Sequence, residues 1–259
     1  MKTRRSVLRV SAPVLALGLA LSASAQVTSP QGSYGILLNQ WIDAKNVTSA
    51  LLAVLNFDGA GNISGSYTLV TKSYAVLTGA MTGTYSGNPD GSNTVSLTFD
   101  IGATLTAAVV ATDGGTGLQF LVTGGNAVSP GQIVTGTARI QSAQGTMPAG
   151  SYGYLLNRWP DANHDSQGIF GVLNLDGAGN VRGSYAIART TDPTFFSGTL
   201  TGAYSINPSG AGSLTVRLDF GVTATFAIVF TDGGSGVLML QTDESDGFGQ
   251  VVSGTARMQ

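Results

Sequence analysis

An internal duplication constrains the fold of this chain more than any other feature. The segment 32–35 returns at 150–153, an offset of 118 residues, and the segment 54–62 returns at 172–180 with a single substitution. Copies of a supersecondary unit at a fixed offset indicate tandem domains of one fold. Each copy is about 110 residues long, an ordinary size for one domain. The sequence therefore predicts two similar domains in one chain.

Within a copy, short apolar segments alternate with residues typical of tight turns. Asp58–Asn62, Asn88–Gly91 and Asp113–Gly115 combine Asp or Asn with Gly, which tolerate the positive φ angles of hairpin turns. No segment has a 3.6-residue apolar period over helical length. The expected strands of the first copy are 32–41, 50–57, 62–71, 76–86, 94–100, 103–112, 117–123 and 132–140. This pattern predicts an all-β chain of two tandem eight-stranded antiparallel up-and-down barrels, with a pair of β-sandwiches as the alternative.

Paired Gly and Tyr residues favour the barrel. Gly-x-Tyr occurs in each copy, for example at Gly65 and Tyr67 and at Gly83 and Tyr85. Residues two apart share one strand face. A Gly beside a bulky Tyr lets a strand coil while the ring fills the space inside. On an open sheet the aromatic rings would instead cover the strand glycines.

The amino terminus has the pattern of an export signal. Basic residues are followed by an apolar stretch and by Ala23-Ser24-Ala25, and the pair Arg4-Arg5 resembles a twin-arginine leader. We expect a signal peptide at 1–25, repeat 1 at 26–141, a linker at 142–149 and repeat 2 at 150–259. A cleaved leader predicts a secreted or periplasmic bacterial protein. Because the chain has no Cys, no disulfide braces the fold.

Charge and residue inventory exclude several functions. Removing 1–25 leaves 8 basic and 14 acidic residues, a net charge of −6, so we expect no nucleic-acid partner. His164 is the only His and has no His at its repeat position, and Glu244 is the only Glu. Without a repeated titrating pair or nucleophile we expect no enzyme activity and no cofactor. The loop around Asp58 places oxygen ligands as a calcium loop does, but a hairpin turn explains the same residues, and no metal site is predicted.

The two Trp residues are the leading candidates for binding. Trp41 and Trp159 occupy matching positions, each two residues before an Asp, Asp43 and Asp161. Trp41 follows Tyr34 by seven residues, so on one strand the two side chains face opposite ways. A Trp at the barrel rim can stack on a flat ligand or anchor a partner. Sealing the barrel end, or a contact between repeats, would also explain it.

The repeat resembles the calycin group, the lipocalin- and avidin-like barrels. The resemblance rests on Gly32-Ser33-Tyr34 with Arg139, and on Gly150-Ser151-Tyr152 with Arg257. In that group a Gly-x-Trp opens the first strand, and an arginine of the last strand packs over the aromatic ring to close one barrel end. This chain has Tyr where the group has Trp. The resemblance implies a cup that holds a ligand, without naming the ligand.

Some strands are apolar on both faces, which a lone barrel in water does not need. They include 51–55, 225–230 and 237–240. We expect their outer faces to be covered by the sister domain, by another chain, or by lipid in a single outer-membrane barrel of about 16 strands.

The function predicted from sequence is an exported, non-enzymatic module that holds a small apolar or aromatic ligand. The predicted ligand-binding residues are Tyr34, Trp41, Asp43, Arg139, Tyr152, Trp159, Asp161 and Arg257. The expected partners are a small molecule and a sister-repeat or second-chain contact, with no membrane partner. The alternative is a structural or adhesive extracellular protein with solid barrels.

Overall fold

The structure is a computed structural model of the 259-residue chain. It describes residues 29–42, 49–71, 75–128, 132–141, 147–159, 166–190, 195–243 and 251–259. The predicted signal peptide and most of the predicted linker lie outside these residues. The described part of the chain contains no helix with the length and apolar character that a membrane crossing needs.

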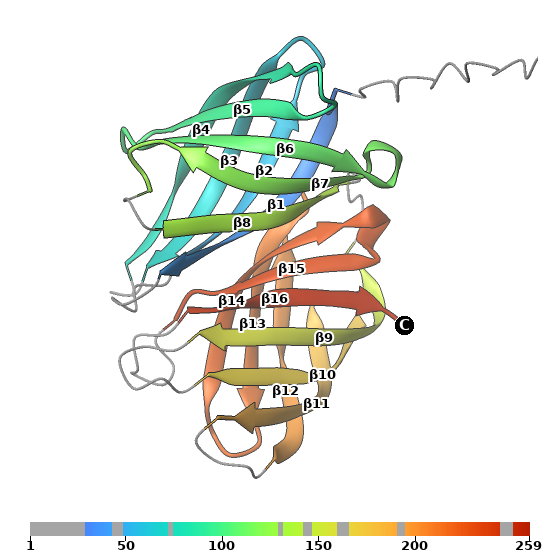
Figure 1. Cartoon of the computed structure of the whole chain (residues 1–259). Helices are drawn as coiled ribbons and strands as arrows, with labels where there is room; N and C mark the ends of the chain where they lie inside the picture. The colour runs from blue at the N-terminus through green and yellow to red at the C-terminus, as the bar shows by residue number, and fades with distance from the viewer. Residues whose placement is uncertain are drawn as a thin grey trace, which may run out of the picture.

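The first repeat forms a closed barrel in which every strand pairs antiparallel with its sequence neighbour (Figure 1). Pairing between β1 and β8 completes the closure, with Gly35 opposite Arg139. The strands are β1 Gly32–Ile42, β2 Ser49–Phe57, β3 Asn62–Thr71, β4 Val76–Gly87, β5 Asn93–Phe99, β6 Thr104–Thr112, β7 Gly117–Gly124 and β8 Gln132–Ile140.

The second repeat forms a second closed barrel with the same strand order. Its strands are β9 Ala149–Trp159, β10 Gln167–Asp176, β11 Asn180–Arg189, β12 Phe196–Ile206, β13 Ala211–Leu218, β14 Thr223–Thr231, β15 Gly236–Gln241 and β16 Val251–Met258. The predicted fold class is therefore confirmed. Two separate barrels replace both the sandwich alternative and the single large barrel.

Turn chemistry ends the strands where the sequence indicates. The Oδ1 atom of Asp58 accepts hydrogen bonds from the backbone N–H of Ala60 at 2.7 Å and of Asn62 at 2.9 Å. Gly59 has a φ of 79°, a conformation that favours glycine. Asp176 makes the same contacts in the second repeat. The loop that has oxygen atoms spaced as in a calcium site is thus a hairpin turn held by its own carboxylate.

Side chains fill both barrels. In the first barrel the Phe57 ring packs edge-on against Tyr34 and Tyr85, with centroids 5.5 and 5.1 Å apart. In the second barrel Tyr152 and Phe230 are fully buried. Edge-to-face aromatic pairs at these distances pack favourably. The interior of each barrel is therefore a hydrophobic core of the kind that a closed eight-stranded sheet can enclose.

Glycines set the curvature of the strands around this core. A Cβ atom built on Gly65 would lie 2.1 Å from the carbonyl oxygen of Val54, and one on Gly83 would lie 2.1 Å from that of Ser96. Both strands approach their neighbours too closely for any other residue. Tyr67 and Tyr85, two residues further on, are buried in the core. The Gly-x-Tyr pairs thus let the strands coil while the tyrosine rings fill the interior, as the sequence predicts.

A third apolar cluster joins the two barrels. The outer faces of β1 and β2 contact those of β14, β15 and β16, and these strands lie at the boundary between the barrels in Figure 1. The cluster consists of Leu37, Ala50, Leu52, Val54 and Val70 of the first barrel with Val229, Leu238, Leu240 and Val251 of the second. The sister barrel is therefore the cover for the strands that are apolar on both faces.

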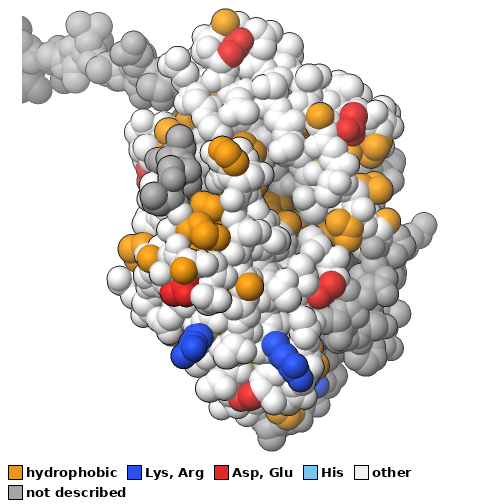
Figure 2. Space-filling view, turned by 180° about the vertical axis from the view of Figure 1, so that it is seen from behind, with side chains coloured by type: hydrophobic (Ala, Val, Ile, Leu, Met, Phe, Trp, Pro, Cys, Tyr) orange, Lys and Arg blue, Asp and Glu red, His pale blue; other side chains and the backbone are white. Residues whose placement is uncertain are grey.

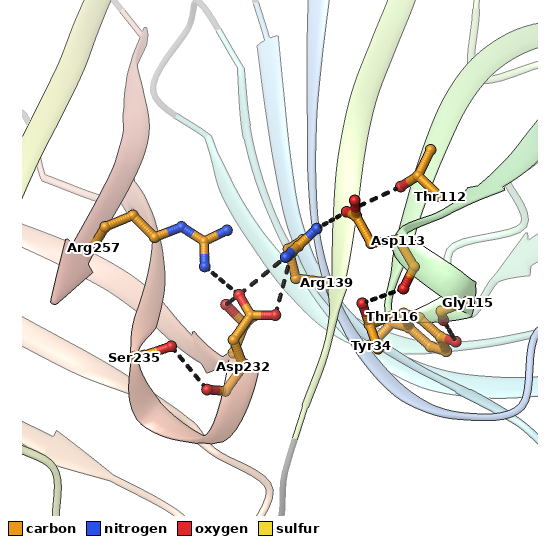
Figure 3. Close-up of polar contacts among 10 residues, drawn as sticks. Tyr34, Thr112, Asp113, Gly115, Thr116, Arg139, Asp232, Ser235 and Arg257 are labelled. Carbon is orange, nitrogen blue, oxygen red and sulfur yellow. Dashed lines mark hydrogen bonds and ion pairs between the residues drawn. The ribbon is translucent and has the colours of Figure 1, made fainter.

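Close approach and polar contacts complete this interface. A Cβ atom on Gly35 would lie 2.6 Å from Cγ1 of Val229, so only glycine allows the barrels to meet here. Arg139 donates from Nε to Asp232 Oδ1 at 3.2 Å and also forms an ion pair with Asp113 of its own barrel (Figure 3). Ser253 donates to Asn39 Oδ1 at 2.7 Å. The interface thus has an apolar centre with polar contacts beside it.

Candidate functional site

The two ends of each barrel differ in the side chains they expose. In the first barrel, the end at which β1, β3, β5 and β7 finish is called the loop end. The matching end of the second barrel, where β9, β11, β13 and β15 finish, has the same name. The opposite end of each barrel is the turn end. At the loop end of the second barrel, Phe195 is 71 % exposed and Phe220 is 57 % exposed, and Phe196 is also exposed. The repeat-matched positions of the first barrel are Val76, Leu77 and Ile101, all exposed. Matched exposure of large apolar side chains in both repeats marks the loop ends as candidate binding surfaces.

In the second barrel these aromatic side chains are held in place by neighbours. The Phe220 ring packs edge-on against Tyr185, with centroids 5.9 Å apart. The guanidinium of Arg189 lies 5.0 Å from the centre of the Phe196 ring, a cation–π contact. An aromatic surface held this way loses little conformational entropy when a partner binds.

The carboxylate of Asp219, the residue before Phe220, holds the end of β13 against β12. Asp219 accepts a hydrogen bond from the Tyr185 hydroxyl at 2.7 Å and from the backbone N–H of Thr199 at 2.7 Å. A Cβ atom on Gly198 would lie 2.3 Å from Asp219 Oδ2, so glycine makes room for this carboxylate. The first barrel repeats the arrangement with Asp100, Tyr67 and Ala80.

These hydrogen bonds shift the proton affinity of both groups. The backbone N–H of Thr199 and then the Tyr185 hydroxyl hold the pKa of Asp219 below its usual value. Burial and then the Asp219 carboxylate raise the pKa of Tyr185 to about 12. The pair is therefore a neutral phenol donating to a charged carboxylate at neutral pH. Asp219 is a positioning group for the rim and carries a negative charge there.

The first barrel has a small hollow at its loop end. A cavity of about 190 Å³ is lined mainly by apolar side chains, among them Leu38, Leu51, Phe99 and Val134, with Gln40 and Ser49 at its polar side. Pockets for small ligands are commonly about 300–1,000 Å³. The hollow is below that range.

In each repeat the structure places the predicted Tyr and Trp at opposite ends of one strand. Tyr34 lies at the turn end, buried, and donates a hydrogen bond to the carbonyl oxygen of Gly115. Trp41 lies at the other end of the same strand, roughly 23 Å away at the rise of an extended strand. Tyr152 and Trp159 occupy the corresponding ends of β9. Asp43 and Asp161, like the side chains of both Trp residues and like His164, lie outside the described parts of the structure.

The two arginines also differ from the arrangement that the calycin resemblance implies. Tyr34 points into the barrel, whereas Arg139, opposite Gly35, lies on the outer face. Arg139 bridges Asp113 and Asp232, and Arg257 forms an ion pair with Asp232 (Figure 3). The arginines therefore serve the outer wall and the barrel interface, and neither covers the buried Tyr of its own barrel.

The rim residues that the sequence interpretation missed had a usable signal. Phe195 and Phe196 are adjacent, and Phe220 directly follows Asp219 at a tight turn, where large apolar residues have no structural need. On the face shown in Figure 2, charged side chains are few and hydrophobic ones are scattered over both barrels. Among the described residues, no group of three or more His, Asp or Glu side chains is arranged to hold a metal ion.

Comparisons with known proteins give a distant likeness only. No protein-family model matches the chain, and no curated protein matches it. A double mutant of transferrin binding protein B from Haemophilus parasuis Hp5 has a TM-score of 0.31 and 8% identity over 89% of this chain and 76% of its own. Intact Ap-TbpB, with its N and C lobes, has a TM-score of 0.31 and 9% identity over 90% of this chain and 79% of its own.

The prediction of a small-molecule partner is corrected by the structure of the barrels. The physical reason lies in the barrels, whose interiors are occupied by core side chains, and the hollow of about 190 Å³ at the mouth of the first is smaller than common ligand pockets. Neither the small-molecule ligand nor the exclusion of a membrane partner is retained. The chain is thus a pair of closed eight-stranded barrels, each with its own hydrophobic core.

Proposed function

We propose that this protein is an exported, non-enzymatic module that binds a protein partner through the loop ends of its two barrels. The observation that carries the proposal is the exposure of Phe195, Phe196 and Phe220 at one barrel rim, matched by Val76, Leu77 and Ile101 at the other. Large apolar side chains at a surface are the usual anchors of protein interfaces.

The rim also has a defined charge. The carboxylates of Asp100 and Asp219 are exposed next to Ile101 and Phe220, and hydrogen bonds keep their pKa low. A partner of matching chemistry presents an apolar patch with basic residues at its edge. Filled barrels support this reading, because they act as scaffolds that hold the rims in place.

The test is retention of a partner by the purified mature protein. The protein, immobilised, is exposed to the proteins secreted by the producing organism, and the retained species are identified by mass spectrometry. Phe220→Ser is expected to weaken binding by about 10- to 100-fold, as loss of an interface anchor does. Met258→Ser, which changes an exposed apolar side chain at the turn end of the second barrel, is the control and leaves binding unchanged. Equal retention by Phe220→Ser, or no retained protein at all, overturns the proposal.

A structural role as a solid spacer is the second candidate. The apolar cluster that joins the barrels favours it, since a spacer needs its two parts fixed to one another. This candidate predicts that no specific partner binds at the rims. It also predicts that variants of the rim residues keep the full function of the mature protein in the extracellular material.

A further inference from the structure

The interface between the barrels joins two different faces. The first barrel contributes β1 and β2, and the second contributes β14, β15 and β16. The chain is a repeat, so each barrel also has the face that its sister uses. The second barrel has the equivalent of the β1–β2 face on β9 and β10, and the first has the equivalent of the β14–β16 face on β6, β7 and β8. The chain therefore leaves exposed one copy of each of the two faces that form its internal interface.

The free face on β6–β8 keeps the apolar residues of its buried counterpart. Val110, Leu121 and Ile133 are 49–60 % exposed, and their repeat-matched positions Val229, Leu240 and Val251 are at most 3 % exposed. The register is also the same, since Leu121 lies opposite Ala108 and Thr135 as Leu240 lies opposite Ala227 and Ser253.

The free face on β9–β10 likewise repeats the β1–β2 face. Leu155 and Phe170 are about half exposed, and their counterparts Leu37 and Leu52 are buried in the interface. Leu155 lies directly opposite Phe170, as Leu37 lies opposite Leu52. Gly153 occupies the position of Gly35, and a Cβ atom on it would meet only the Gln259 side chain. The glycine that allows close approach inside the chain is therefore also present on the free face.

The ion pairs of the interface have exposed counterparts as well. Arg139 bridges Asp113 to Asp232 across the interface, with side-chain exposures of 27 % for Arg139 and 15 % for Asp232. The counterparts Arg257 and Asp113 are 52 % and 56 % exposed. Arg257 pairs with Asp232 of its own barrel, so it is placed to bridge Asp232 to the Asp113 of a second chain.

We propose that a second copy of this chain docks its β6–β8 face on the β9–β10 face of the first, repeating the internal interface between molecules. A contact between two different faces leaves one of each free at the ends, so it continues head to tail into a ring or a filament. Gln119 stands where the internal interface has Leu238, which makes the contact between molecules more polar and its association weaker than the internal one.

The test uses the full mature chain in sedimentation velocity over a range of concentrations. The wild type is expected to form dimers and longer species as concentration rises. Phe170→Glu and Leu121→Glu each remove one face, and each variant alone is expected to be monomeric. An equimolar mixture of the two is expected to form a dimer that does not grow, because each chain keeps the face that the other lacks. Thr201→Glu, on the exposed wall of β12, is the control and associates as the wild type does.

A gain of association provides the second measurement. Gln119→Leu restores the internal residue and is expected to lower the dissociation constant by about tenfold, or about 1.4 kcal/mol. A monomeric wild type and Gln119→Leu at all concentrations overturn the proposal, as does a mixture of the two Glu variants that does not dimerise. The outcome is independent of the proposed function, because the rim variant Phe220→Ser leaves both outer-wall faces intact. Retained folding of every variant is checked by its circular dichroism and thermal melting.

Discussion

Gly35 sets how closely the two barrels approach. Its missing side chain makes room for Cγ1 of Val229 and for Cγ2 of Thr231, which would lie 2.6 and 2.9 Å from a Cβ atom. Both neighbours are β-branched and cannot turn away easily. The sequence marks this glycine only as part of a repeated Gly-Ser-Tyr-Gly segment. The structure shows that one copy faces a barrel and the other, Gly153, does not.

Gly35→Val is therefore expected to destabilise the protein by about 1–3 kcal/mol, as overpacking does. Urea unfolding of the mature protein at low concentration measures the change. Gly153→Val is the matched control, because a Cβ atom there meets only the flexible Gln259 side chain, and it is expected to change stability little. An equal loss in both variants would show that strand bending, and not barrel contact, requires the glycine.

The hydroxyl of Tyr185 predicts a loss of stability at alkaline pH. Its folded pKa is raised to about 12, first by burial and then by Asp219, above the unfolded value of about 10. A raised folded pKa means that the stabilising effect is complete below about pH 10 and is lost as the pH rises toward 12. Thermal melting between pH 8 and 12 measures it, and absorbance of the phenolate follows the titration.

The variant Asp219→Asn removes one of the two causes of this shift. It is expected to lower the tyrosine titration midpoint toward its usual value while burial keeps it raised. A titration curve identical to that of the wild type would contradict the role given to the carboxylate.

At the scale of elements, β7 and β15 occupy matching positions in the two repeats and have different surroundings. Both are antiparallel strands that follow a short 3-10 turn, at Asp113–Gly115 and Asp232–Gly234. Every residue of β15 is buried, because its inner face fills the second barrel and its outer face meets the first. The outer face of β7 is exposed.

Leu240→Ala is expected to cost about 2–5 kcal/mol, the range for truncating a fully buried Leu. Leu121→Ala, at the matching position of β7, is expected to change stability by about 0.5 kcal/mol or less, as surface substitutions do. Chemical denaturation of the two variants gives the comparison. Similar losses would contradict the placement of Leu240 in the barrel interface.

At the scale of the whole molecule, the apolar cluster couples the two barrels. Each barrel has its own core, and the cluster on β1, β2, β14, β15 and β16 lies between the cores. The ion pair of Arg139 with Asp232 is partly exposed and contributes about 1 kcal/mol or less. The apolar contacts therefore carry most of the coupling.

Leu52→Asp is expected to separate the unfolding of the two barrels, because it buries an unpaired charge in the interface without entering either core. Scanning calorimetry is expected to show two transitions in place of one cooperative transition. Asp232→Asn, which weakens the ion pairs of Asp232 with Arg139 and Arg257, is expected to keep a single transition. Two transitions in the wild type would show that the barrels unfold independently from the start.

Much of the fold could be predicted from the sequence, and little of the candidate site. The expected first-repeat strands agree with β1–β8 to within one residue at each end, because turn residues such as Asp58 and Gly59 act locally. Of the predicted binding residues, Tyr34 and Trp41 do not meet, because they lie at opposite ends of one strand. Phe195 and Phe196 lie where β12 begins, and Phe220 lies after the end of β13. Local sequence does not show that these two connections meet at one rim.

The sequence alone determined the duplication and the strand boundaries and favoured closed barrels over sandwiches, since these depend on turn chemistry and on the placement of residues along each strand. Only the tertiary structure decided which outer faces are covered. Val110 and Val229 are the same residue at matching positions, yet 50 % and 3 % of their surfaces are exposed. Local sequence and strand register are alike at both positions. The difference arises because only one of the two faces has a barrel packed against it.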